Sequence, residues 1–224
     1  TMSDPLRKRQ YASDMFKIDK IHKLYSGRGV RVAILDTGVD AGHSDLKERV
    51  ISAKNFIRGL GYSPEVHGTA VAGIIGAGIN GFGMEGVAPE AGLLALRACK
   101  QVSKEHPECE CFTDSLSKAL DEAILQKADI VNMSFGTTHY DSLLARLIDR
   151  GAEQGVLFIA PAGNSTNERE LRFPASHTSV ISVGGFDEKL NPYPNPEITK
   201  KTSVSAPAVN IIKTVPGNRH NFMS

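Results

Sequence analysis

Three polar side chains in this sequence are of types that carry acyl-transfer chemistry, and each one lies in a glycine-containing motif. Asp36 opens Asp-Thr-Gly, His67 opens His-Gly-Thr, and Asn164 closes Ala-Gly-Asn. A carboxylate can orient an imidazole and stabilise its protonated form, and a neutral imidazole is a competent general base near pH 7. A fixed carboxamide can donate a hydrogen bond to a developing oxyanion, an effect of roughly 3 kcal/mol.

Each motif alone has a simpler interpretation. Asp36 could be a turn residue at a strand end, His67 a surface or capping histidine, and Asn164 a left-handed turn residue after glycine. Aspartic proteases also use Asp-Thr-Gly, but they need two copies to form a carboxylate pair, and this sequence has one. Only the combination of the motifs argues for a hydrolytic site.

Short apolar runs alternate with helical patterns along the chain, and these elements must position the polar residues. Strands are expected at 30–35, 92–98, 129–133, 156–160, 180–183 and 209–212, and helices at 14–24, 67–77, 116–127 and 142–154. The alternation predicts an α/β fold, three-layer, with a mostly parallel sheet and helices on both faces. A length of 224 residues fits a single domain over residues 1–224.

Ligands of such sheets bind at the carboxyl ends of the strands. Asp36, Ser134 and the pair Gly163-Asn164 each lie just past a predicted strand, so the sequence predicts that they gather at one edge. Ser134, Phe135 and Gly136 would offer backbone groups to an extended peptide there.

The order and spacing of these motifs resemble those of the subtilisin-like serine proteases, over about residues 14–224. The segments that carry the resemblance are DTGVD (36–40), HSDL (43–46), HGTAVAG (67–73), GVAP (86–89), AGN (162–164), FPA (173–175), VISVG (180–184) and SAP (205–207). The resemblance implies a serine endopeptidase in which Asp36 orients His67, His67 is the general base and Asn164 stabilises the oxyanion.

The same resemblance implies two walls of a substrate cleft. Ser134, Phe135 and Gly136 would line one edge, and the strand that carries Leu94 and Leu96 would form the other and pair with the peptide.

The nucleophile of this family is the serine of a Gly-Thr-Ser motif at the start of a buried helix. The sequence ends Asn-Phe-Met-Ser at Ser224, and the resemblance places that serine about three residues beyond it. A relative that binds peptides without cutting them is one alternative, and an esterase with the same triad logic is another. A nucleotide-binding protein is disfavoured, because no Gly-x-Gly-x-x-Gly follows the first strand.

This chemistry requires no cofactor. Asp45 and Asn80 align with positions that bind calcium in some members of the family, and oxygen ligands suit Ca²⁺. Two interpretations therefore stand, a structural calcium site and a turn in which Asp45 is only a cap, and we favour the second.

Three cysteines, Cys99, Cys109 and Cys111, are too few for a disulfide framework in a chain of 224 residues. We expect free thiols. A single disulfide at Cys99 and a zinc site that includes His106 are the weaker alternatives.

Charge and hydropathy limit the partners. The formal net charge is +1, so no global field would draw the chain to nucleic acid or to acidic lipid. No run of 18 apolar residues predicts a membrane span, and residues 1–5 contain no apolar core of a signal peptide. We expect a polypeptide substrate, with the protein's own pro-segment as a second candidate partner. A secreted and a cytoplasmic location both stay open.

Overall fold

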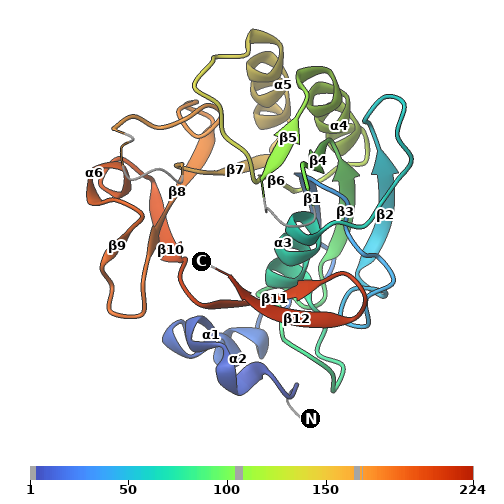
Figure 1. Ribbon diagram of the computed structural model, residues 1–224, viewed down its shortest axis with the longest axis vertical. Helices are drawn as coiled ribbons and strands as arrows, with labels where there is room; N and C mark the ends of the chain where they lie inside the picture. Colours follow the sequence, from blue (N-terminus) through green and yellow to red (C-terminus); the bar gives the residue numbers. More distant parts are fainter. Residues whose placement is uncertain (1–3, 104–107, 164–166, 168, 224) are drawn as a thin grey trace.

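A parallel β-sheet runs through the middle of the molecule (Figure 1). The computed structural model describes residues 4–103, 108–163, 167 and 169–223. The strand order is β10-β8-β7-β6-β1-β3-β2, and β9 pairs antiparallel with β8. The strands of this sheet are β1 (Arg31–Asp36), β2 (Val50–Asn55), β3 (Gly92–Arg97), β6 (Ile130–Met133), β7 (Leu157–Pro161), β8 (Val180–Phe186), β9 (Pro192–Tyr193) and β10 (Val204–Pro207).

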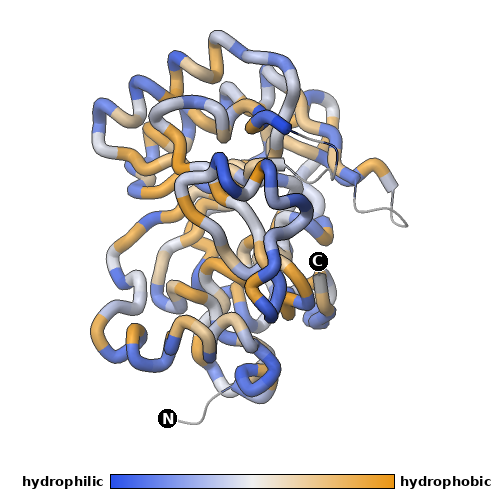
Figure 2. The backbone as a smooth tube through the Cα atoms, turned by 90° about the vertical axis from the view of Figure 1, so that its left-hand side faces the viewer, coloured by the Kyte–Doolittle hydropathy of each residue, from blue (hydrophilic) through white to orange (hydrophobic). Residues whose placement is uncertain are grey.

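Helices cover both faces of the sheet because its central strands are apolar on both sides. Ala33 and Leu35 of β1 pack in a core with α4 (Thr113–Leu125) and α5 (Ser142–Glu153). Val32 and Ile34 of the same strand pack in a second core with α3 (Val66–Gly76). In Figure 2 hydrophobic stretches of chain accordingly run through the centre of the molecule. The three-layer α/β architecture expected from the sequence is confirmed.

Two antiparallel hairpins extend this framework. β11 (Ile211–Val215) pairs with β12 (Arg219–Met223) and lies against α3, where the fully buried Thr214 donates its hydroxyl to the carbonyl of Thr69 at 2.6 Å. β4 (Cys99–Gln101) pairs with β5 (Cys109–Cys111) just after the end of β3. The remaining short helices are η1 (Arg7–Arg9), α1 (Tyr11–Met15), α2 (Ile18–His22) and α6 (Pro196–Thr199).

The boundaries differ from the sequence prediction where local patterns are weak. The helix expected at 14–24 is two short helices, because Lys17 takes a left-handed conformation with φ 53° between them. The edge strand β2 was not expected, since most of its residues are partly or fully exposed and it lacks a continuous apolar run. Within the described ranges, no helix has the length and apolar character needed to cross a bilayer.

Candidate active site

The end of strand β1 and the start of helix α3 bring Asp36 and His67 into contact. Asp36 is the last residue of β1, and its carboxylate is 2% exposed. The Nδ1 atom of His67 lies 2.8 Å from Oδ1 and 3.0 Å from Oδ2 of Asp36. Because a carboxylate only accepts hydrogen bonds, Nδ1 carries the proton. In the neutral imidazole Nε2 then carries the free lone pair, and no described residue is hydrogen-bonded to that atom.

Backbone contacts fix the strand end against the helix start. The hydroxyl of Thr37 accepts a hydrogen bond from the backbone N–H of Gly68 at 2.9 Å, and the N–H of Thr37 donates to Asp36. A Cβ atom on Gly68 would lie 2.2 Å from the carbonyl oxygen of Thr37. Glycine after His67 therefore allows the first turn of α3 to pack directly on the β1 backbone.

The charge of Asp36 raises the pKa of His67, while burial and the ammonium group of Lys213 act in the opposite direction. The imidazolium that would form after proton abstraction is thus stabilised by the same carboxylate that orients the ring. The His67 side chain is 24% exposed, so its free edge reaches a solvent-accessible cavity.

That cavity has a volume of about 1030 Å³, and it extends from Asp36 and His67 to the predicted wall at residues 134–136. Ser134, Phe135 and Gly136 line it together with Asp36 and His67. They follow β6, whose ladder with β1 ends at Met133, so their backbone lies beyond the paired part of the sheet. A two-way hydrogen bond between Thr137 and Phe173, at 2.8 and 2.9 Å, holds the far end of this wall.

The prediction that Leu94 and Leu96 form the second wall of the substrate cleft is wrong. Leu94 and Leu96 are each 1% exposed, and β3 is paired with β1 on one side and with β2 on the other. Both leucine side chains lie in the core below α4, so neither can contact a substrate and β3 has no free edge for a peptide. The β4–β5 hairpin lines this side of the cavity instead. Asn164, the predicted oxyanion donor, lies outside the described residues.

The cysteines of this hairpin correct the expectation of free thiols. The antiparallel register sets Cys99 opposite Cys111, and the two form a disulfide. Cys109 keeps its thiol, and burial raises the pKa of that thiol to about 12. In the described part of the chain no three His, Cys, Asp or Glu residues are placed to hold a metal, and His106 lies outside that part.

The predicted calcium ligands Asp45 and Asn80 lie on adjoining segments, since Asn80 donates to the carbonyl of Ser44 at 3.0 Å, and both are engaged by protein groups. Asp45 Oδ2 accepts hydrogen bonds from the Met84 N–H at 3.2 Å and from His220 Nε2 at 2.8 Å. Asn80 accepts from the N–H of Phe82 through its side-chain oxygen. Asp45 Oδ1 is buried without a partner, and it is the one vacant oxygen of the two side chains. Ca²⁺ takes about six to eight oxygens, so a calcium site here would need further oxygens besides those of Asp45 and Asn80, and it stays a prediction.

Sequence reasoning missed two charged residues next to the site, Glu65 and Arg97. Glu65 precedes α3 as its N-cap residue, and Arg97 ends β3 directly opposite Asp36 in the strand register. One signal in the sequence could have found them. Arg97 is a lone charge at the end of an otherwise apolar strand, and a charge buried there needs a partner of opposite sign.

Comparison with known proteins agrees with the geometry. Residues 27–223 match the subtilase family, peptidase S8. The "Intracellular serine protease" of Paenibacillus polymyxa is 35% identical over 224 residues, covering 94% of this chain and 66% of the relative. "Subtilisin DY" of Bacillus licheniformis is 30% identical over 220 residues, covering 96% and 77%.

A third relative differs from these in length. The "Minor extracellular protease Epr" of Bacillus subtilis is 34% identical over 194 residues, covering 84% of this chain. The chain spans 28% of that relative and 66% of the Paenibacillus protein. The family match, the relatives and the contact between Asp36 and His67 lead to one conclusion: the chain belongs to the subtilase family.

Proposed function

We propose that this chain carries the general base and the orienting carboxylate of a serine endopeptidase. The observation that carries the proposal is the contact of His67 Nδ1 with both carboxylate oxygens of Asp36, at 2.8 and 3.0 Å, beside a cavity of about 1030 Å³. The nucleophile would be a serine C-terminal to Ser224 in the complete protein.

In the acylation step His67 Nε2 accepts the proton of the serine hydroxyl while its oxygen attacks the scissile carbonyl carbon. His67 then gives that proton to the leaving nitrogen as the C–N bond breaks, which leaves an acyl-enzyme and a free amine. Water, deprotonated by the same nitrogen, attacks the ester carbonyl, and His67 returns that proton to the serine oxygen as the ester C–O bond breaks and the acid product leaves. Asp36 stays ionised and stabilises the imidazolium in both steps.

The cavity wall favours a peptide over a small ester as substrate. The backbone of residues 134–136 lies past the paired part of β6, where an extended chain can add main-chain hydrogen bonds. A small ester has no such backbone to pair.

The test is intact-mass analysis of the full-length protein before and after a serine-directed fluorophosphonate. One adduct, mapped to a serine C-terminal to Ser224 and absent in His67→Ala, supports the proposal. His22→Ala is the matched control, because that partly exposed histidine does not line the cavity of His67 and hydrogen-bonds to the carbonyl of Val87, so labelling should stay unchanged. No adduct on folded wild-type protein, with peptide binding retained, would favour the non-catalytic alternative.

A further inference from the structure

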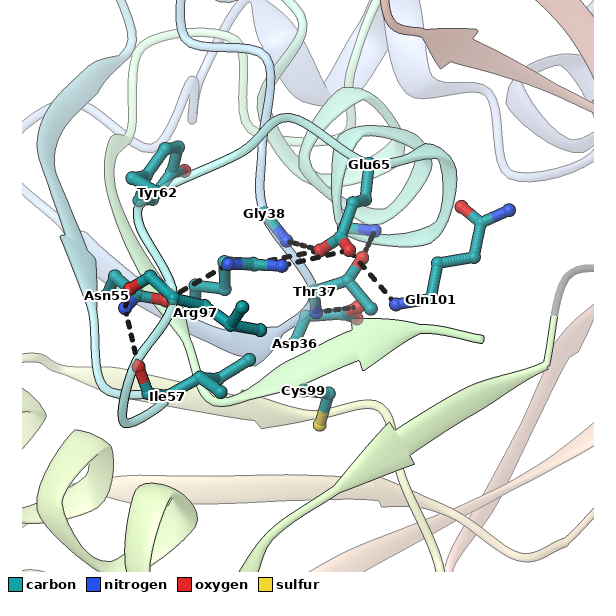
Figure 3. Close-up of polar contacts among 12 residues, drawn as sticks. Asp36, Thr37, Gly38, Asn55, Ile57, Tyr62, Glu65, Arg97, Cys99 and Gln101 are labelled. Atoms are coloured by element: carbon teal, nitrogen blue, oxygen red, sulfur yellow. Dashed lines mark hydrogen bonds and ion pairs between the residues drawn. The ribbon is translucent and has the colours of Figure 1, made fainter. Parts of the chain in front are cut away.

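A buried ion pair lies directly behind the site. The side chain of Arg97 is 4% exposed and that of Glu65 is 13% exposed. Arg97 donates from Nε to Glu65 Oε2 at 2.9 Å and from Nη2 to Oε1 at 3.0 Å, in a two-pronged arrangement (Figure 3). Neither residue is among those that line the cavity, so a direct contact with substrate is not their role.

Glu65 links three separate segments of the site. Its Oε2 also accepts from the N–H of Gly38 at 2.9 Å, two residues after Asp36. Its Oε1 also accepts from the N–H of Gln101 in β4 at 3.0 Å. Its own backbone N–H donates to the carbonyl of Gly38 at 2.8 Å. One side chain thereby connects the end of β1, the start of α3 and the hairpin that lines the cavity (Figure 3).

Arg97 extends the connection to the loop that leads into α3. Its Nη1 donates to the carbonyl of Gly61 at 2.7 Å and to Asn55 Oδ1 at 3.2 Å. The Asn55 amide in turn donates to the carbonyls of Ile57 and Leu60. Only the planar fork of an arginine can make these bonds and the paired bonds to Glu65 together.

The carboxylate is charged at neutral pH despite its burial. Burial by itself disfavours the charged form, but hydrogen bonds from Arg97, Gly38 and Gln101 outweigh it, and the pKa of Glu65 is lowered. A buried ion pair is weak support for stability, because desolvation offsets most of the attraction, but it can specify one arrangement of the segments that it joins.

We propose that Glu65 and Arg97 are a positioning pair, which holds the Asp36–His67 contact and the β4–β5 side of the substrate cavity in register. The proposal rests on the proposed function. If the pair is broken, the start of α3 can move relative to β1, and the contact between His67 and Asp36 loosens.

The experiment compares Arg97→Lys and Glu65→Gln with Arg7→Lys. Arg7 is a matched control, because it is 6% exposed and binds Asp19 through the same two-pronged geometry, at 2.9 Å for both bonds. Its ion-pair partners are Asp14 and Asp19 of the N-terminal segment and Glu85, and none of them lines the cavity of His67. The double variant Glu65→Gln/Arg97→Gln buries no unpaired charge, and it replaces any single variant that does not fold.

Two measurements are made on folded, full-length protein: kcat and KM for peptide hydrolysis, and the NMR titration of the His67 imidazole. We expect the site variants to lose about 10- to 100-fold in kcat, with a smaller rise in KM. The His67 titration should move to lower pH, because the carboxylate that raises its pKa is held less closely. Arg7→Lys should change neither.

Unchanged kcat and unchanged His67 titration in folded site variants would overturn the proposal, as would equal losses in Arg7→Lys. If wild-type protein hydrolyses no peptide, the proposed function fails on its own. The His67 titration then still decides whether Glu65 and Arg97 position the imidazole.

Discussion

The disulfide between Cys99 and Cys111 closes a loop with a sequence separation of 12 residues at the edge of the cavity. Replacing both cysteines with serine removes this constraint on the unfolded chain. For a loop of this length the chain-entropy argument gives a loss of about 3 kcal/mol in the free energy of unfolding. In a domain of this size that corresponds to a drop of roughly 6 to 12 °C in Tm.

The assay is thermal unfolding followed by circular dichroism, with and without a thiol reductant. Reductant should lower the Tm of the wild-type protein to that of the double variant and should leave the double variant unchanged. Cys109→Ser is the matched control: it alters the remaining thiol of the same hairpin but leaves the disulfide, so its Tm should stay near that of wild type.

A second readout connects the disulfide to the cavity. Cys99 and Cys111 line the cavity with Asp36 and His67, so a loosened hairpin should raise KM more than it lowers kcat. The reasoning is refuted if the double variant unfolds at the wild-type Tm, or if non-reducing peptide mapping finds Cys109 in the disulfide.

Three further predictions follow from single contacts. Asp36→Asn removes the charge that raises the pKa of His67, while burial remains, so the NMR titration of His67 should move to lower pH. In the wild-type protein, protonated His67 stabilises the folded state through Asp36. This stabilisation is complete below the unfolded pKa of about 6.5 and is lost as pH rises through the higher folded pKa. The variant lacks it, so the Tm deficit of the variant should be larger at pH 5 than at pH 9. Asp141→Ala deletes the N-cap of α5, which accepts two backbone N–H groups at 3.0 Å, and should cost about 1 kcal/mol in urea unfolding. Gly73→Ala would place a Cβ atom 2.2 Å from Oγ1 of Thr214, and should cost about 1–3 kcal/mol in the same assay by pushing β11 off α3.

The parts of the fold that follow from local pattern could be predicted from the sequence. The apolar run that ends at Asp36 is β1, and the small-residue segment that contains His67 is α3. Parallel strands end at one edge, so Asp36 and Ser134 were expected to lie near each other, and both line the same cavity.

The second wall of the cavity could not be predicted, because it depends on strand order. The apolar run in β3 is typical of a strand covered on both faces, but it does not tell whether both hydrogen-bonding edges of that strand are paired. The strand β2, which pairs with its other edge, has no apolar run longer than two residues. The β4–β5 hairpin could not be predicted either. Its two strands have three residues each, too few to show a period, and the pairing that joins Cys99 to Cys111 appears only in the register.

Glu65 and Arg97 show the same limit at the site itself. The position of Arg97 at the end of an apolar strand indicates that it needs a partner, but nothing in the sequence identifies Glu65 as that partner, since a glutamate in a loop is typical of the surface. Their burial follows from the closure of α3 onto β1, in which residues 36–38 and 65–68 contact each other through five hydrogen bonds from side chain or backbone. Rotation of α3 would break these contacts together, so the Asp36–His67 geometry depends on pairs that are far apart in the chain and share no local pattern.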